Sequence, residues 1–303
     1  MPAQKMHDDE VHTDAALVRR LLEGQFPQWA RLPIRPVPSS GTDNALYRLG
    51  EDRVVRMPRI HWATGQIEKE RRWLPVLAPQ LPLAIPQPLV TGVAAEGYPW
   101  EWSVYRWLEG EFATFARLAD PCQAAMDLAH FINCLQEIDT TGGPPAADHN
   151  IRGLPLAHRD ADTRRAIADM GDMYDVGVLT AAWEVALQAP NWDRPPVWLH
   201  GDMLGGNLLV SDGQLSAVID FAGLAVGDPA CDLMIAWGLF EGESRQVFRQ
   251  ALGVDDAAWA RGRGQALSQA LIFIPYYLDT NPVGVDRARH AVEAVLADFG
   301  TGR

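Results

Sequence analysis

The fold is indicated most clearly by the stretch His200-Gly201-Asp202-Met203-Leu204-Gly205-Gly206-Asn207, together with Ile219-Asp220-Phe221 further along the chain. Apolar runs at 197–199, 207–210 and 215–221 predict short strands around these polar residues. The turn signal Ser211-Asp212-Gly213-Gln214 separates the last two runs and predicts a hairpin. The sequence therefore predicts a polar loop and a terminal carboxylate held by apolar strands.

Asp202, Asn207 and Asp220 offer two carboxylates and one amide oxygen. Phosphoryl transfer needs a carboxylate that accepts the proton of a hydroxyl, and oxygen ligands that hold Mg²⁺ against phosphates. The order and the five-residue step from Asp202 to Asn207 follow the kinase signature, and Asp220-Phe221-Ala222 stands where D-F-G would. A carboxylate at the end of an apolar strand is costly unless it has a ligand, which favours a functional reading of Asp220.

The segment Val226-Gly227-Asp228-Pro229-Ala230-Cys231-Asp232-Leu233 completes a resemblance to the aminoglycoside phosphotransferase family, a relative of the protein kinases. The resemblance covers about residues 35–290. It implies an α+β, protein-kinase-like fold of two lobes with the nucleotide in the cleft. The expected division is a small β-rich nucleotide-clamping lobe at 1–107 and a larger helical lobe at 108–303, which would hold the catalytic loop and the acceptor site.

The same resemblance implies Asp202 as the catalytic base and Asn207 and Asp220 as Mg²⁺ ligands. The Gly227-Asp228-Pro229 motif and Asp232 match a segment that braces the catalytic loop in the family. His200 is expected to be a buried residue that orders the loop. The family often has a second His and a Pro in this loop, where the chain has Met203-Leu204-Gly205-Gly206.

The first third of the chain reads as strands with one helix. Residues 45–49 and 53–57 predict a hairpin, 64–77 a helix ended by Pro79, and 102–107 a further strand. The remainder reads as mostly helical around the central hairpin, with helices predicted at 124–138, from 162 to 187 and after Asp232.

An ion pair is predicted from periodicity in the helix at 64–77. Glu70 lies three residues after Ile67 and four before Leu74, so its carboxylate shares the apolar face. A buried carboxylate requires a cation, and Arg56 is the candidate. In the resembling family this pair positions the α- and β-phosphates.

The resemblance implies a nucleotide, ATP or GTP, bound in part by backbone groups of a hinge near Arg106 and Leu108. Tyr105 falls near the gatekeeper position of that hinge, although strand aromatics commonly pack in the core. The loop around Gly41 could cover phosphates through its N–H groups. The full set of predicted nucleotide-binding residues is Ser40, Gly41, Thr42, Asn44, Arg56, Glu70, Tyr105, Arg106 and Leu108.

The expected acceptor is a small-molecule hydroxyl, with an antibiotic of the aminoglycoside or macrolide type preferred and a role in resistance implied. Carboxylates line the family's acceptor site when the substrate is polycationic. The candidate acceptor-binding residues are Asp228, Asp232, Glu241 and Tyr276.

Composition agrees with a cytoplasmic protein that binds neither nucleic acid nor membrane. The chain has 303 residues, 48% of them hydrophobic, and a net charge of −13, with about +1 over residues 1–108 and −14 over 109–303. An acidic second half disfavours nucleic acid and suits a cationic small molecule. No apolar run approaches the ~18 residues of a membrane span, and three cysteines without C-x-x-C spacing suggest neither a disulfide framework nor zinc.

Three alternatives remain open at this point. A metabolite kinase of the choline or amino-alcohol type is the rival within the class. A metal-dependent hydrolase built on His200, Asp202 and Asp220 is disfavoured because a two-metal site requires more ligands. A nucleotide-binding pseudokinase would be expected to lack a member of the catalytic triad, and none is missing.

Overall fold

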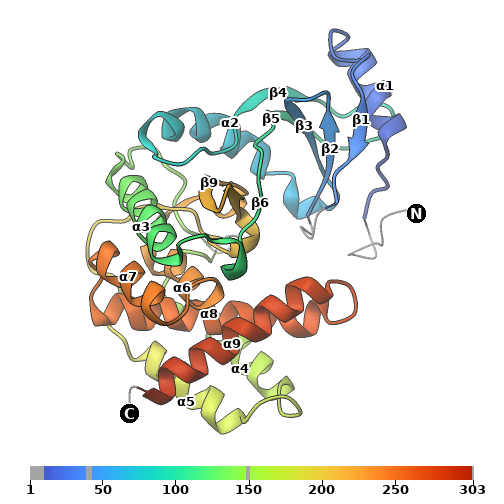
Figure 1. The fold of residues 1–303 in the computed structure, drawn as a ribbon. Coiled ribbons are helices and arrows are strands. Elements are labelled where there is room, and N and C mark those ends of the chain that lie inside the picture. Colours follow the sequence, from blue (N-terminus) through green and yellow to red (C-terminus); the bar gives the residue numbers. More distant parts are fainter. Residues whose placement is uncertain (1–9, 39–42, 148–150, 302–303) are drawn as a thin grey trace. The chain divides into compact units, whose positions relative to one another are not determined.

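The computed structural model describes residues 10–38, 43–147 and 151–301, and the chain folds as two compact units (Figure 1). The first unit comprises the residues up to Pro79 and Ala84–Glu109, and the second comprises Gln80–Leu83 and the residues from Gly110 onward. The helices are α1 (Ala15–Gln25), α2 (Gln66–Leu77), α3 (Pro121–Glu137), α4 (Asp160–Asp169), α5 (Val176–Leu187), α6 (Ile235–Gly238), α7 (Gly242–Leu252), α8 (Asp256–Tyr277) and α9 (Pro282–Thr301). The strands are β1 (Ile34–Pro36), β2 (Asn44–Leu49), β3 (Arg53–Pro58), β4 (Pro88–Gly92), β5 (Trp102–Arg106), β6 (Glu111–Phe112), β7 (Val197–Leu199), β8 (Leu208–Ser211), β9 (Gln214–Val218) and β10 (Ala225–Gly227).

The strands of the first unit form one antiparallel sheet in the order β1-β2-β3-β5-β4. The predicted hairpin is present as β2 and β3, with Tyr47 opposite Val55 and the turn glycine Gly50 at φ 62°. Glycine suits this position because a side chain is strained in the left-handed region. The predicted strand at 102–107 is β5, which pairs with β3 and β4.

The first unit has a helix, α1, that the sequence reading missed. Asp14 caps it by accepting a hydrogen bond from the Leu17 amide at 2.7 Å. Leu17 and Leu21, with Val18 and Leu22, are spaced at i and i+4 and pack into the core of the sheet. The cap and this spacing together were a readable helix signal.

Helix α2 matches the predicted helix, although Pro75 lies inside its last turns. Its buried face consists of Ile67, Glu70, Leu74 and Leu77, as the periodicity predicts. The helix therefore directs one carboxylate into the interior of the first unit.

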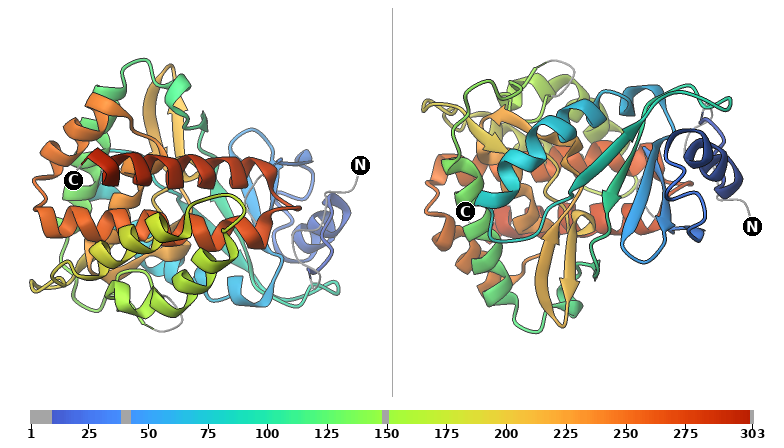
Figure 2. Two further views of the ribbon diagram at one scale, coloured as in Figure 1. Left: turned by 90° about the horizontal axis from the view of Figure 1, so that it is seen from below. Right: turned by 90° about the horizontal axis from the view of Figure 1, so that it is seen from above.

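The second unit is mainly helical and carries two small sheets, β10-β7 and β6-β8-β9. Helices α8 and α9 lie side by side (Figure 2). The helices predicted from 162 to 187 are present as α4 and α5, which are separated where the chain turns around Gly171. The predicted helix at 124–138 is present as α3 and starts earlier, where Asp120 accepts from the amides of Cys122 and Gln123 at 3.0 Å.

The central hairpin consists of β8 and β9, and β7 pairs with β10. The hairpin turn at Asp212 and Gly213 has φ values of 52° and 79°, the left-handed geometry that suits a tight connection. An α+β fold with a β-rich first unit and a helical second unit is thus confirmed. Among the helices of the described residues, none combines the length and apolar character that spanning a bilayer requires.

Candidate active site

The catalytic-loop candidates lie on the connection between β7 and β8 and at the end of β9. A backbone hydrogen bond from the Ile219 amide to the Asn207 carbonyl, 2.8 Å long, ties the two segments together. Asp220 follows this tie directly and has a left-handed backbone, with φ 62° and ψ 70°. That conformation costs roughly 1–2 kcal/mol for a residue with a side chain, and such strain tends to cluster at functional sites.

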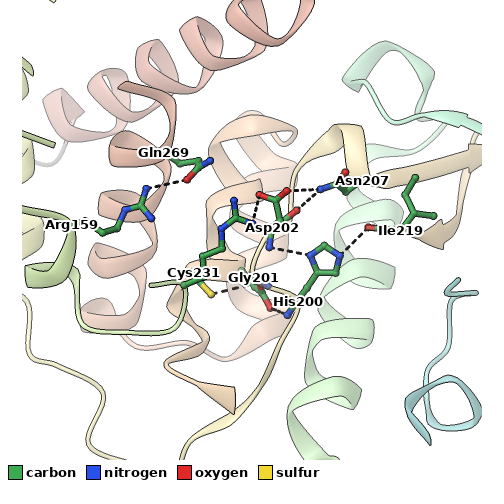
Figure 3. A network of polar contacts seen from close by, with 10 residues as sticks. Arg159, His200, Gly201, Asp202, Asn207, Ile219, Cys231 and Gln269 are labelled. Atoms are coloured by element: carbon green, nitrogen blue, oxygen red, sulfur yellow. Dashed lines mark hydrogen bonds and ion pairs between the residues drawn. The ribbon is translucent and has the colours of Figure 1, made fainter. Parts of the chain in front are cut away.

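The amide of Asn207 is oriented by Asp202. Its Nδ2 donates to the Asp202 backbone carbonyl at 2.8 Å and to the Asp202 Oδ2 at 3.0 Å (Figure 3). Both amide hydrogens are thereby directed at Asp202, so the Oδ1 of Asn207 is left to accept from other groups or bind a cation. An amide oxygen beside a carboxylate is a suitable donor set for a hard divalent cation.

His200 is fully buried and joins the two segments. Its Nδ1 accepts from the Asp202 amide at 3.2 Å, and its Nε2 lies 3.0 Å from the Ile219 carbonyl (Figure 3). Since a carbonyl only accepts, this network assigns the proton to Nε2 and makes the ring neutral. The ring also packs edge-on against Phe221, with centroids 4.6 Å apart. His200 therefore has the ordering role that the sequence suggests.

Asp232 braces the loop from below. One carboxylate oxygen accepts from the His200 amide and the other from the Gly201 amide, both at 2.7 Å. The residue is 1% exposed. Burial raises the pKa of Asp232 above its ordinary value, while the two amide donors favour the ionised form. This contact is the brace that the family resemblance implies.

The loop also depends on a close backbone approach. Gly201 has φ 81°, and a Cβ placed there would lie 2.3 Å from the Gly223 carbonyl oxygen. Any side chain at this position would force the catalytic segment away from the residues that follow Asp220. The Gly in the His-Gly-Asp sequence is thus required by both backbone conformation and space.

Arg152 is a site residue that sequence reasoning missed. Its Nη1 lies 2.9 Å from the Asp202 Oδ1, and the two side chains are 25% and 19% exposed. The residue comes from a loop some fifty residues before Asp202, and no motif marks it. The pair orients one oxygen of the Asp202 carboxylate while Asn207 orients the other.

In the first unit, the predicted ion pair is present. Arg56 Nη1 lies 2.6 Å and 2.8 Å from the two carboxylate oxygens of Glu70, and Arg56 Nη2 donates to Gln66 at 3.0 Å. The amide oxygen of Asn44, in the orientation that satisfies its hydrogen bonds, accepts from Arg56 Nε at 3.1 Å. The guanidinium is therefore held on several sides.

Tyr105 belongs to the same cluster. Its hydroxyl donates to Glu70, and its ring is 3% exposed. Burial, followed by the Glu70 charge, raises the pKa of Tyr105, so the hydroxyl stays protonated as a donor. The Tyr105 hydroxyl is therefore engaged by the Glu70 carboxylate, a contact that the prediction of a gatekeeper role did not include.

Of the other predicted nucleotide-binding residues, two lie within the described part of the chain and three do not. Arg106 is exposed and donates from Nε to Gln87 at 2.9 Å, and Leu108 is partly buried. Ser40, Gly41 and Thr42 lie outside the described residues.

The structure does not support an acceptor-binding role for Asp228 and Asp232. Asp228 is buried, accepts from the Ala230 amide at 2.9 Å and pairs with Arg261 at 2.8 Å. Asp232 has both oxygens on the catalytic loop. Neither carboxylate is available to a cationic acceptor, because each is already engaged inside the second unit.

The remaining acceptor candidates lie at the surface. The Glu241 side chain is half exposed and lies 3.8 Å from His290, and Tyr276 is 60% exposed and packs against Tyr277. Within the described part of the chain, no group of three or more His, Cys, Asp or Glu side chains gathers in the manner of a metal cluster. The predicted Mg²⁺ ligand pair, one amide and one carboxylate, does not require such a group.

We expect Asp232→Asn to lower the free energy of unfolding by about 1–3 kcal/mol, because an NH₂ group would then face one of two buried N–H donors. Turnover should fall with it, since the amide of Asp202 is ordered through His200. Asp212→Asn, in the exposed hairpin turn, is the matched control and should stay within about 0.5 kcal/mol. Urea denaturation and initial rates measure both effects, and a fully stable and active Asp232→Asn would contradict the bracing role.

The comparisons with known proteins agree with this geometry. The profile of the phosphotransferase enzyme family matches residues 34–267. No curated protein matches the sequence significantly.

Several solved structures share the fold. The GDP complex of wild-type aminoglycoside 2'-phosphotransferase-IIIa is 19% identical with a TM-score of 0.73, covering 95% of this chain and 100% of that one. The streptomycin-ATP-APH(2")-IIa ternary complex is 18% identical with a TM-score of 0.60 (94% and 99% covered). The macrolide 2'-phosphotransferase MphH from Brachybacterium faecium, as apoenzyme, is 23% identical with a TM-score of 0.59 (90% and 98% covered).

These likenesses confirm the predicted protein-kinase-like fold. The family profile spans most of the sequence, from β1 to the middle of α8, and includes the loop that carries Asp202 and Asn207. The chain therefore belongs to the phosphotransferase enzyme family and is a small-molecule kinase.

Proposed function

We propose that this phosphotransferase moves the γ-phosphoryl group of ATP or GTP onto a hydroxyl of a small molecule, with Asp202 as the catalytic base. The observation that carries the proposal is the arrangement of Asp202. Asn207 and Arg152 orient its two carboxylate oxygens, and its side chain remains 19% exposed. A carboxylate that is fixed and reachable suits proton transfer from a bound hydroxyl.

In the proposed reaction the hydroxyl oxygen forms a bond to the γ-phosphorus as the bond from phosphorus to the bridging oxygen breaks. The nucleoside diphosphate leaves with the electron pair of that bond, and Asp202 takes the hydroxyl proton. Positioning and charge stabilisation supply most of the rate enhancement in phosphoryl transfer. The rigid support of the loop by His200 and Asp232 serves this positioning.

Asn207 and Asp220 are the proposed ligands of Mg²⁺. The donor set fits, because the Asn207 amide hydrogens are engaged by Asp202 and its oxygen is left for a cation. Asp220 is held by the strained turn after β9. A bound Mg²⁺ would neutralise charge on the phosphate oxygens.

The nucleotide is proposed to interact with Arg56 of the first unit, which Glu70 and Tyr105 hold in place. Backbone groups near Arg106 and Leu108 are proposed to bind the base, and the loop that contains Ser40, Gly41 and Thr42, with Asn44 at its end, to approach the phosphates. These roles rest on the resemblance to the family.

An antibiotic of the aminoglycoside or macrolide type is the acceptor that the resemblance favours, and solved relatives are named for both classes. A metabolite kinase is the second candidate, and the position of Arg152 beside Asp202 favours it. Action in the reducing cytoplasm is supported by three cysteines that are all unpaired. Incubation with Mg²⁺, ATP or GTP and a panel of hydroxyl compounds, followed by nucleoside diphosphate release, tests the proposal.

Asp202→Ala should reduce turnover ~10²–10⁴-fold and leave nucleotide affinity nearly unchanged, because the base acts only in the chemical step. Asp202→Asn is the matched variant: it keeps an oxygen for Asn207 but loses basicity, and should be reduced comparably. Steady-state kinetics and nucleotide titration separate the two effects. Near-wild-type phosphorylation by either variant would exclude Asp202 as the base.

Tyr105→Phe should raise the KM for nucleotide roughly 3- to 30-fold, because it removes a hydrogen bond to the charged Glu70 carboxylate. The difference between Tyr105→Ala and Tyr105→Phe measures the effect of the ring itself, since both variants lack the hydroxyl. If Tyr105 is also the gate, only the Ala variant shifts the ratio of kcat/KM between ATP and GTP. Unchanged kinetics for Tyr105→Phe would show that the hydroxyl does not support the ion pair.

A further inference from the structure

Arginine side chains gather around the catalytic loop of the second unit. Arg152 pairs with Asp202, Arg159 lies in the turn that leads into α4, and Arg287 lies on α9. Figure 3 shows the Arg159 side chain directed toward the side of the site on which Asp202 lies, and the charges of Arg152 and Asp202 both affect the pKa of Arg159. The proposed function uses Arg152 only to orient Asp202, and it gives no role to Arg159 or Arg287.

Arg159 is 5% exposed and is held by neutral groups. Its Nε donates to Ser268 at 2.8 Å. Its Nη2 donates to Gln269 at 3.0 Å (Figure 3). Thr163 donates to the Arg159 carbonyl, so Ser268 donates in turn to Thr163. Among the residues that the structure describes, no carboxylate lies within ion-pair distance of this guanidinium.

The charge of Arg159 persists despite its burial. Burial, and secondly the charge of Arg152, lower the pKa of Arg159 to about 10, so it is cationic at neutral pH. A buried cation is normally compensated by an anion, since desolvation disfavours its charged form. The neighbourhood of Arg159 is therefore electrostatically suited to a further negative group.

The ion pair with Asp202 leaves part of the Arg152 guanidinium accessible. Its Nη1 lies 2.9 Å from the Asp202 Oδ1, and a quarter of the side chain is exposed. Its position is fixed by the next residue, because the Gly153 carbonyl accepts from the Asp228 amide at 2.9 Å. A guanidinium has five N–H donors and binds planar oxyanions with two of them at once. Arg152 is thus a fixed donor beside the catalytic base.

Arg287 adds positive charge to the same loop. A Cβ on Gly206 would lie 2.8 Å from the Arg287 Nη1, so the guanidinium rests against the backbone before Asn207. Burial, and then the charge of Arg117, lower the pKa of Arg287. Within the described ranges it has no ion pair.

Two of the carboxylates predicted to bind a polycationic acceptor are occupied elsewhere. Asp228 pairs with Arg261, and Asp232 binds the backbone of the catalytic loop. A polycation brought to Asp202 would meet arginines at close range, and like charges at short distance in a partly buried site repel strongly. The immediate surroundings of Asp202 thus disfavour an aminoglycoside.

We propose that Arg152 and Arg159 form an oxyanion subsite beside Asp202, and that the acceptor carries a carboxylate or phosphate group near the hydroxyl that is phosphorylated. This inference rests on the proposed function, which places the hydroxyl of the acceptor at Asp202. The anionic group binds the two guanidinium groups, and the neighbouring hydroxyl is placed against the Asp202 carboxylate. The subsite selects hydroxy acids or phosphorylated alcohols over neutral and cationic compounds.

The first test measures phosphorylation of a panel that contains a hydroxycarboxylate, its neutral primary amide, a polyol phosphate, an aminoglycoside and a macrolide. The anionic compounds should be the preferred acceptors. Arg152→Gln should raise their KM on the order of 10- to 100-fold, as expected for loss of a charge-assisted hydrogen bond. The KM of the neutral amide should change much less, so the preference for the hydroxycarboxylate over its amide should fall, and Arg152→Lys should retain part of that preference.

Arg165→Gln is the matched control, because Arg165 lies on α4 with 72% of its side chain exposed. It should leave every KM unchanged. Transfer to aminoglycosides or macrolides with no preference for anionic compounds would overturn the subsite while the proposed function stands.

The second test does not depend on turnover. Calorimetric titration of the nucleotide-free protein with inorganic phosphate should show binding that Arg152→Gln and Arg159→Met each weaken at least 10-fold. Arg165→Gln and Arg56→Gln should retain that binding, which separates it from the proposed nucleotide phosphate contacts. Equal phosphate affinity in wild type and Arg152→Gln would overturn the subsite, whatever the panel shows. If Arg159→Met fails to fold, Arg152→Gln, at a partly exposed position, decides the question alone.

Discussion

The carboxylate of Asp232, buried beneath the catalytic loop, is the interaction on which the rest of the site depends. Its two oxygens accept hydrogen bonds from the backbone amides of His200 and Gly201. These amides follow the end of β7 and would otherwise have no acceptor. A buried amide without an acceptor costs about 1–3 kcal/mol, so the contact fixes the direction in which the chain leaves the strand. The ring of His200 in turn contacts the Asp202 amide and the Ile219 carbonyl at the end of β9, and so it holds both segments in place.

The support for Asp232 itself comes from α8. Arg261 on that helix forms a buried ion pair with Asp228, which caps the short helical turn that contains Asp232. Gly262, the next residue of α8, allows close packing, since a Cβ there would lie 2.5 Å from the Leu233 Cβ. The catalytic loop is thus connected to the longest helix of the second unit by one continuous set of buried contacts. The amide of Asp228 also donates to the Gly153 carbonyl, which holds the backbone next to Arg152.

The arrangement of the loop could be predicted from the sequence better than that of its surroundings. The spacing of Asp202, Asn207 and Asp220 is local and carries its own signal, and the pairing of Arg56 with Glu70 follows from helical periodicity. Contacts between distant segments leave no such pattern, because their geometry is decided by tertiary packing. The pairing of Arg152 with Asp202, the neutral partners of Arg159 and the burial of Asp228 all belong to this second kind. Helix α1 is different, since its cap and apolar spacing were readable but were not recognised.

The central claim is that the γ-phosphoryl group goes to a hydroxyl that Asp202 activates, rather than to water. Phosphorus-31 NMR of a reaction with Mg²⁺, nucleoside triphosphate and the acceptor panel follows the fate of that group directly. A new phosphomonoester resonance should grow in step with the nucleoside diphosphate and should be lost in Asp202→Ala. Release of the entire γ-phosphate as inorganic phosphate, at a rate independent of every acceptor, would contradict it and favour a hydrolase.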